Sequence, residues 1–247
     1  MTQRFEHIHR LAYNQTSGAG PGVVFLGGYA SDKEGTKALY LEDWAQRRGR
    51  AFLRFDYAGH GSSDGAFEAG TIGSWCDDAV SIIKGMTTGP QILVGSSMGG
   101  WISLLIARDH PDLVAGLVTI AAAPDFTIEL ENSLSDMERT AMERDGRIER
   151  VSDYGPEPMI FTANLIRDGR RHLILNKPLT LPGPTRFLQG TDDADVSPDV
   201  ATALLDHAEG DDIRLTLVKG ADHRFSGKDE LALLVQSIED VTARVGG

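Results

Sequence analysis

A short apolar run leads into a serine flanked by glycines, in the segment Ile92-Leu93-Val94-Gly95-Ser96-Ser97-Met98-Gly99-Gly100-Trp101. The pattern Gly-x-Ser-x-Gly is centred on Ser97, whereas Ser96 lacks the symmetric glycines. A serine at a sharp strand-to-helix turn adopts a strained backbone, and glycines two residues before and after it let the strand and helix come close. We therefore predict that Ser97 is a nucleophile at the end of a strand. The alternative is a glycine-rich turn whose serine is unreactive.

Short apolar runs alternate with segments of helical period on both sides of this motif, which indicates crossover helices on a parallel sheet. The runs of strand length are residues 23–26, 51–55, 92–94, 117–120, 186–188 and 213–217. The first helix is expected to be capped by Ser31 or Asp32 and to end at Gly49. The pattern predicts an α/β fold with a mostly parallel central sheet and helices on both faces.

One region departs from this alternation, because residues 124–177 carry helical signals and many charges without a clear strand signal. A loop of that length is improbable in a compact domain, whereas a lid over a site explains it. We predict a core formed by residues 1–123 and 178–247, with residues 124–177 as an inserted helical cap. The apolar side chains of Met159, Ile160, Phe161 and Leu165 are expected to face Ser97 and to line an acyl pocket.

The charge balance of the 247 residues excludes several kinds of partner. There are 24 Lys and Arg against 36 Asp and Glu, a formal net charge of -12. Proteins that bind nucleic acid or anionic lipid need a basic face, so we expect neither partner. Arg167, Arg170 and Arg171 form a local basic cluster, which is either a solvated helix face or a site for a carboxylate.

Cysteine content and the apolar segments bear on the compartment. Cys76 is the single cysteine, so an intrachain disulfide and a thiolate-cluster metal site are excluded. The segment Met1–Arg10 is charged and lacks the apolar core of a signal peptide. The most apolar stretch, Leu113–Pro124, is shorter than the ~20 residues of a membrane-spanning helix. We expect a cytoplasmic protein without membrane insertion.

A nucleophilic serine needs a histidine base and an acid that orients the histidine. In this type of fold both follow the serine in the chain. His223 fits best, because it lies in a loop just after the last predicted strand. Three aspartates, Asp192, Asp193 and Asp195, follow the preceding strand. Asp193 is preferred because it stands three residues after Gly190 and three before Val196.

Two backbone amides are candidates for binding the oxyanion that forms during acyl transfer. The first follows the nucleophile and belongs to Met98. The second is expected in the loop after an early strand, where Gly27 and Gly28 allow the amide of Tyr29 to turn toward the serine. These glycines also fit a plain turn.

Four segments together resemble the α/β-hydrolase superfamily over nearly the whole chain: residues 25–38, 54–65, 90–101 and 222–224. Within it, the similarity is greatest to the mitochondrial acyl-protein thioesterases that are also described as acyl-glucuronide esterases. The resemblance implies a cofactor-free serine hydrolase of small-molecule or acyl-protein esters and thioesters. It matches Ser97 to the nucleophile, Asp193 to the acid and His223 to the base. Many members have His-Gly where this chain has Gly27-Gly28.

Two other functions remain open on the residues alone. The same three side chains can cleave peptides or amides when the pocket differs. A receptor that keeps the hydrolase fold without its activity is the third possibility, and the complete set of catalytic candidates argues against it.

Overall fold

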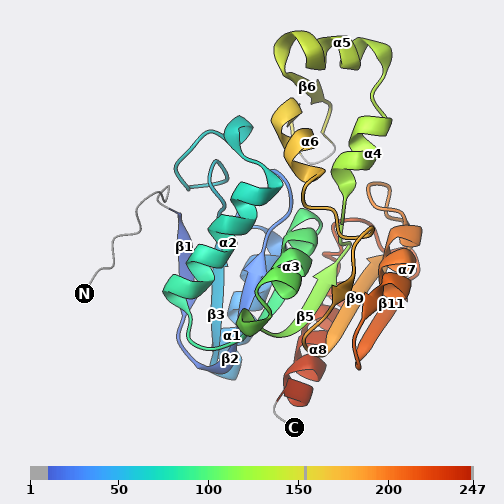
Figure 1. Cartoon of the computed structure of the whole chain (residues 1–247). Helices are drawn as coiled ribbons and strands as arrows, with labels where there is room; N and C mark the ends of the chain where they lie inside the picture. The colour runs from blue at the N-terminus through green and yellow to red at the C-terminus, as the bar shows by residue number, and fades with distance from the viewer. Residues whose placement is uncertain (1–10, 153–154, 246–247) are drawn as a thin grey trace.

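The computed structural model describes residues 11–152 and 155–245, so the segment Met1–Arg10 lies outside the described residues. Within the described part of the chain, the main sheet has seven strands in the order β1-β3-β2-β4-β5-β9-β11 (Figure 1). Their bounds are β1 Tyr13–Thr16, β2 Ala19–Leu26, β3 Arg50–Phe55, β4 Gln91–Ser96, β5 Val114–Ile120, β9 Thr185–Gly190 and β11 Ile213–Val218. Only β1 runs antiparallel to its neighbour among these paired strands.

The predicted α/β class and its parallel strands are confirmed. Each of the predicted runs lies inside a strand. The runs of β2, β3, β4, β5 and β9 have side chains buried on both faces of the sheet, whereas the last strand, β11, lies at the end of the strand order and is only partly buried. Strand β1 was not predicted. It is a polar edge strand of four mostly exposed residues, so the sequence shows no apolar run at this position.

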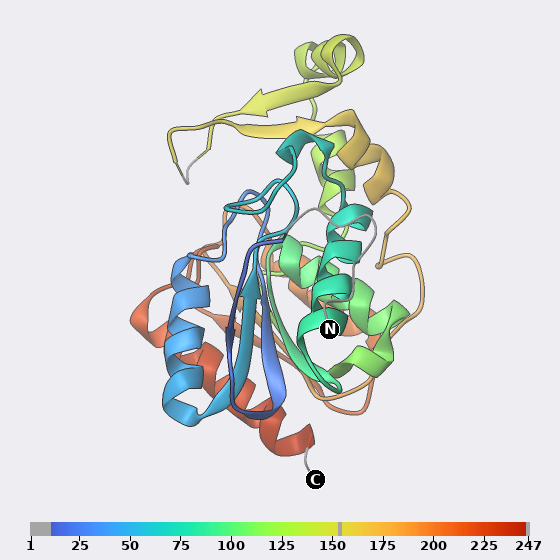
Figure 2. The same cartoon turned by 90° about the vertical axis from the view of Figure 1, so that its left-hand side faces the viewer.

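Helices cover both faces of the sheet (Figures 1 and 2). One face packs against α1 (Thr36–Arg48) and α8 (Lys228–Val245), and its core includes Trp44 and Ile238. The other face packs against α2 (Ile72–Met86), α3 (Met98–Asp109) and α7 (Pro198–His207). Two short 3-10 helices, η1 (Phe67–Ala69) and η2 (Pro111–Leu113), lie in connections. No helix of the described residues is long and apolar enough to cross a bilayer.

The first helix ends where the sequence predicts and begins later. Gly49 stops α1 in the left-handed conformation, with φ 63°. The helix starts at Thr36 with Gly35 as its N-cap, so the expected cap at Ser31 or Asp32 is wrong. Asp32 is used earlier, because its carboxylate accepts a hydrogen bond from the amide of Glu34 within the loop.

The helices and strands between residues 126 and 169 lie over the carboxyl ends of the strands (Figures 1 and 2). After them the chain runs beside α3, where the carbonyls of His172 and Leu173 accept hydrogen bonds from Trp101 and Arg108. The segment from residue 124 to 177 contains three α-helices among its described residues, α4 (Phe126–Asn132), α5 (Asp136–Asp145) and α6 (Ala163–Gly169). It also contains an antiparallel pair of strands, β6 (Arg147–Arg150) and β7 (Met159–Thr162), which the helical expectation missed. A second small pair, β8 (Leu179–Thr180) and β10 (Ala208–Glu209), follows it.

Arg54 of β3 ties the loop after β2 to the sheet. Its buried guanidinium donates to Glu42 Oε2 at 3.0 and 2.8 Å and to the carbonyl of Lys33 at 2.9 Å. Glu42 lies on α1, and Lys33 lies in the loop between β2 and α1. Because that loop carries Tyr29, Arg54 fixes the backbone near a predicted site residue.

We expect Arg54→Met to lower the free energy of unfolding by about 3 kcal/mol, because it leaves the Glu42 carboxylate without its buried partner. Urea denaturation followed by circular dichroism measures the change. Arg48→Met is the control, since the Arg48–Glu239 pair is exposed on both sides and should cost less than about 1 kcal/mol. Equal losses in the two variants would show that burial of the Arg54 pair is unimportant.

Candidate active site

Ser97 occupies a strained turn between β4, which ends at Ser96, and α3, which begins at Met98. Its φ of 55° and ψ of -119° lie in a region that residues other than glycine rarely adopt. The two glycines of the motif are required by close packing. A methyl group added at Gly95 would lie 2.3 Å from the carbonyl oxygen of Gly99, and one added at Gly99 would lie 2.1 Å from that of Leu26.

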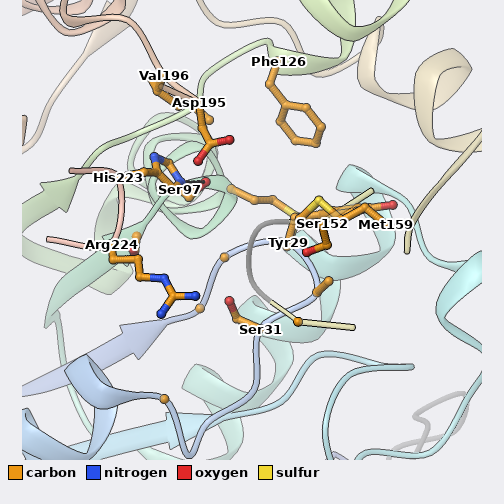
Figure 3. A pocket seen from close by; sticks show the side chains of 18 of the residues that line it. Tyr29, Ser31, Ser97, Phe126, Ser152, Met159, Asp195, Val196, His223 and Arg224 are labelled. Carbon is orange, nitrogen blue, oxygen red and sulfur yellow. Dashed lines mark hydrogen bonds between the residues drawn. The ribbon is translucent and has the colours of Figure 1, made fainter. Parts of the chain in front are cut away.

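The structure brings Ser97, His223 and Asp193 into one hydrogen-bonded chain. His223 Nε2 lies 3.1 Å from Ser97 Oγ, and His223 Nδ1 lies 2.9 Å from Asp193 Oδ2. Asp193 follows β9 and His223 follows β11, so all three residues lie beyond the carboxyl ends of parallel strands. Figure 3 shows the His223 ring directed at Ser97.

The carboxylate of Asp193 is buried and fully engaged. Its Oδ1 accepts hydrogen bonds from the amides of Asp195 and Val196, and its Oδ2 accepts one from the amide group of Gln189. Burial opposes ionisation, but the hydrogen bonds from His223, Val196 and Gln189 outweigh it and lower the pKa of Asp193. An ionised Asp193 accepts a hydrogen bond from Nδ1–H of His223, which keeps the proton of the neutral ring on Nδ1. Nε2 can then accept a hydrogen bond from the hydroxyl of Ser97.

Gln189 is a part of this arrangement that the sequence analysis missed. It is a buried polar residue inside the apolar strand β9, which is the signal that could have identified it. Besides Asp193, its amide nitrogen donates to the carbonyl of Val196 at 3.0 Å. Gln189 therefore holds the loop that carries Asp193.

The loop after β2 runs directly against Ser97. A methyl group added at Gly28 would lie 3.3 Å from the Cβ of Ser97. Tyr29 and Met98 both line the cavity in front of Ser97, Met98 as the first residue of α3. The first amides of a helix have no partner within it and present a partial positive charge, which suits the binding of an oxyanion.

A cavity of about 770 Å³ opens in front of Ser97 (Figure 3). Met159 and Phe161 line it, together with Phe126 and Leu130 of α4, which the sequence analysis did not identify. Ile160 and Leu165 were also expected to line it, and they do not. The reason is that residues 159–162 form a strand, so side chains alternate between its faces, while Leu165 is buried in the core beneath.

The other end of the cavity is polar. Ser31, Lys37 and Arg224 line it, and Figure 3 shows Ser31 and Arg224 away from Phe126. The ammonium of Lys37 donates to the carbonyl of Arg224, the residue next to His223. Burial lowers the pKa of Lys37 to about 8, although the charge of Asp222 opposes this shift. Helix α1 thus holds the histidine loop through Lys37.

His60 and the basic cluster of Arg167, Arg170 and Arg171 do not line this cavity. His60 is buried against Tyr57, Phe67 and Trp75, and burial lowers its pKa. It therefore belongs to the aromatic core. None of Arg167, Arg170 and Arg171 lines the cavity, and Arg170 pairs with Glu131 of α4.

Comparisons with known proteins place the chain in a family. A family model described as serine aminopeptidase, S33, matches residues 22–148. The mitochondrial palmitoyl-protein thioesterase ABHD10 of Homo sapiens is 37% identical over 95% of this chain and 77% of its own length. The protein of that name from Bos taurus has the same identity and coverage.

The same relatives overturn the expected cytoplasmic location, because they are mitochondrial proteins that match nearly the whole of this chain. That expectation rested on a lone cysteine and on the composition of the first ten residues. Neither feature distinguishes one reducing compartment from another, which is why the inference failed.

Two solved structures have the same fold over nearly their full length. A putative hydrolase from Agrobacterium vitis S4 is 41% identical, with a TM-score of 0.90 over 94% of this chain and 92% of that chain. The α/β hydrolase domain-containing protein 10 from mouse is 35% identical, with a TM-score of 0.88 over 95% and 94%. The chain therefore belongs to the α/β-hydrolase family and is a serine hydrolase of esters or thioesters.

Proposed function

We propose that this chain hydrolyses long-chain acyl thioesters through an acyl-enzyme on Ser97. The observation that carries the proposal is the unbroken chain of hydrogen bonds from Ser97 through His223 to Asp193, at 3.1 and 2.9 Å. It supports Ser97 as nucleophile, His223 as general base and Asp193 as the acid that orients the base. The residues act as a unit, since each is unreactive without the next.

In the first step Ser97 Oγ attacks the acyl carbonyl while its proton passes to His223 Nε2. The carbonyl oxygen gains negative charge, which the backbone amides of Tyr29 and Met98 stabilise. The tetrahedral intermediate then expels the thiolate, which takes the proton from His223. Water then attacks the carbonyl of the acyl-enzyme while His223 takes a proton from it, which forms a second tetrahedral intermediate. When this intermediate collapses, the bond to Ser97 Oγ breaks, His223 returns the proton to Oγ, and the carboxylic acid is released.

Residues 124–177 are proposed to form an inserted cap that roofs an acyl pocket, over a core of residues 1–123 and 178–247. The apolar lining by Met159, Phe161, Phe126 and Leu130 supports this assignment. An aliphatic chain gains free energy from such a surface in proportion to the area that it buries. The relatives named palmitoyl-protein thioesterases support a long acyl chain, and a protein-bound cysteine as the acyl donor.

A panel of substrates tests the function: acetyl, butyryl and octanoyl thioesters, a palmitoylated peptide, an acyl glucuronide and an aminoacyl amide. We expect kcat/KM to be highest for long-chain thioesters. Preference for the aminoacyl amide would favour the peptidase activity that the description of the matching family model suggests. No turnover of any member would favour the receptor.

Met159→Ala tests the acyl pocket, because it removes apolar surface that only a long chain reaches. Each buried methylene is worth about 0.8 kcal/mol, so kcat/KM for the octanoyl thioester should fall roughly tenfold, with little change for acetyl. Met137→Ala on α5 is the matched control, since Met137 is 82% exposed and does not line the cavity. Equal losses for acetyl and octanoyl thioesters would place the acyl chain elsewhere.

A fluorophosphonate should label Ser97 and no other residue, because rapid attack on phosphorus needs a serine activated by a base and an oxyanion site. Peptide mapping by mass spectrometry locates the adduct. Ser97→Ala should abolish labelling, whereas Ser96→Ala should retain it. An adduct on Ser96 would contradict the assignment of the nucleophile.

Asp193→Asn should lower kcat by up to ~10⁴, because the amide favours the wrong tautomer of His223 while keeping the geometry. Steady-state kinetics on the best thioester of the panel measures the loss. Asp192→Asn is the control in the same loop, since Asp192 is exposed. A larger loss for Asp192→Asn than for Asp193→Asn would contradict the proposed role of Asp193.

A further inference from the structure

The side chain of Tyr29 takes no part in the chemistry proposed above, yet it connects the sheet core to the segment above the site. Its hydroxyl donates a hydrogen bond to the backbone carbonyl of Ile160 in β7, which is 131 residues away in the chain. Its ring stacks on Phe161 of the same strand, with centroids 5.2 Å apart and planes 8° from parallel. Tyr29 is thus bound to β7 by both its ring and its hydroxyl.

The same ring is also packed against the core. It makes edge contacts with Phe67 at 5.0 Å and with Trp75 of α2 at 5.7 Å. A further edge contact, at 5.9 Å, joins it to Phe126 of α4. A ring held on several sides has little freedom to change rotamer, so a movement of β7 is transmitted to the backbone of Tyr29.

That backbone lies beside the reacting centre. Gly28 packs directly against Ser97, and the amide of Tyr29 is one of the two oxyanion donors proposed above. The value of such a donor depends on its position within a few tenths of an ångström. Small changes in the position of Tyr29 therefore change the stabilisation of the transition state more than the binding of the substrate.

We propose that Tyr29 is a positioning residue whose side chain couples the placement of β7 over the cavity to the placement of its own amide in the oxyanion site. The inference rests on the proposed function. An acyl chain that packs against Met159 and Phe161 holds β7 down, and through Tyr29 it orders the oxyanion donor. Part of the binding energy of the remote chain is then expressed in kcat rather than in KM.

The hydroxyl of Tyr29 is suited to this link. Burial, with a smaller effect from the charge of Glu68, raises its pKa well above the ordinary value, so it remains a proton donor at neutral and alkaline pH. A second link from the paired strands to the core joins Arg147 of β6 to Glu68 at 2.5 Å. Both partners of that ion pair are exposed, so it contributes little.

Tyr29→Phe tests the coupling, because it removes the hydroxyl and keeps the ring. Tyr57→Phe is the matched control, since Tyr57 is also an aromatic of the core and its buried hydroxyl has no hydrogen-bond partner among the described residues. The readouts are kcat and KM, measured separately for acetyl and octanoyl thioesters, and hydrogen–deuterium exchange of residues 159–162. The exchange measurement needs no substrate.

In the wild type we expect kcat for the octanoyl thioester to exceed that for acetyl by about tenfold. Tyr29→Phe should bring this kcat ratio close to one while the ratio of KM values changes little. Exchange of residues 159–162 should become roughly two- to tenfold faster, as expected for the loss of one hydrogen bond. Tyr57→Phe should leave the ratio and the exchange as in the wild type.

The inference is overturned if Tyr29→Phe keeps the wild-type kcat ratio, if the wild-type ratio is itself close to one, or if exchange of residues 159–162 is unchanged. Failure of the proposed function has a different signature, because the wild type would then turn over neither thioester. In that case unchanged exchange in Tyr29→Phe would still reject the link between Tyr29 and β7, and faster exchange would support it.

Discussion

The site depends on one backbone constraint, the positive φ of Ser97 at the end of the central strand β4. A residue in such a conformation costs about 1–3 kcal/mol and persists only where its surroundings hold it. Here the amide of Ser97 donates to the carbonyl of Ile120 at 2.9 Å, and its own carbonyl accepts from Gly100 at 2.9 Å. The neighbouring strand and the first turn of α3 therefore hold the serine hydroxyl at the carboxyl end of the central strand, where the loops after β2, β9 and β11 reach it.

The electrostatic environment distinguishes Asp193 and His223 from the other candidate aspartates and from His60. Of the three aspartates in the loop after β9, only Asp193 is buried, and it is the one whose carboxylate receives several hydrogen bonds. These bonds offset the cost of burying a charge and keep the carboxylate ionised beside His223. His60 is also buried, but it faces aromatic rings and a backbone carbonyl. Burial lowers its pKa against the opposing charge of Asp56, and its Nε2 has no hydrogen-bond partner among the described residues.

The sequence predicts those features that local pattern specifies. The buried apolar runs identify the central strands, and the glycines around Ser97 identify the turn. Both signals are visible in the sequence because they involve residues that are adjacent in the chain. Strands β1 and β6 were missed because these four-residue strands show no apolar run. Strand β7 does carry one, Met159–Phe161, but three apolar residues are too few to distinguish a strand from part of a helix. Phe126 and Gln189 were missed for another reason: their roles follow from contacts with residues distant in the chain.

Tyr29 has one feature that follows from the local sequence and another that follows from contacts with distant residues. Its backbone position follows from the glycines before it, so the sequence predicts an amide near the nucleophile. Its side chain contacts Ile160 and Phe161, which are more than a hundred residues away and belong to a segment of different local structure. The core carries Ser97, His223 and Asp193, the proposed reacting groups, and the overlying segment supplies apolar surface to the cavity. Tyr29 belongs to the core and packs against the overlying segment. In the proposed mechanism this allows substrate length to affect the chemistry, because the ring contacts the elements proposed to bind the acyl chain and adjoins the amide proposed to stabilise the oxyanion.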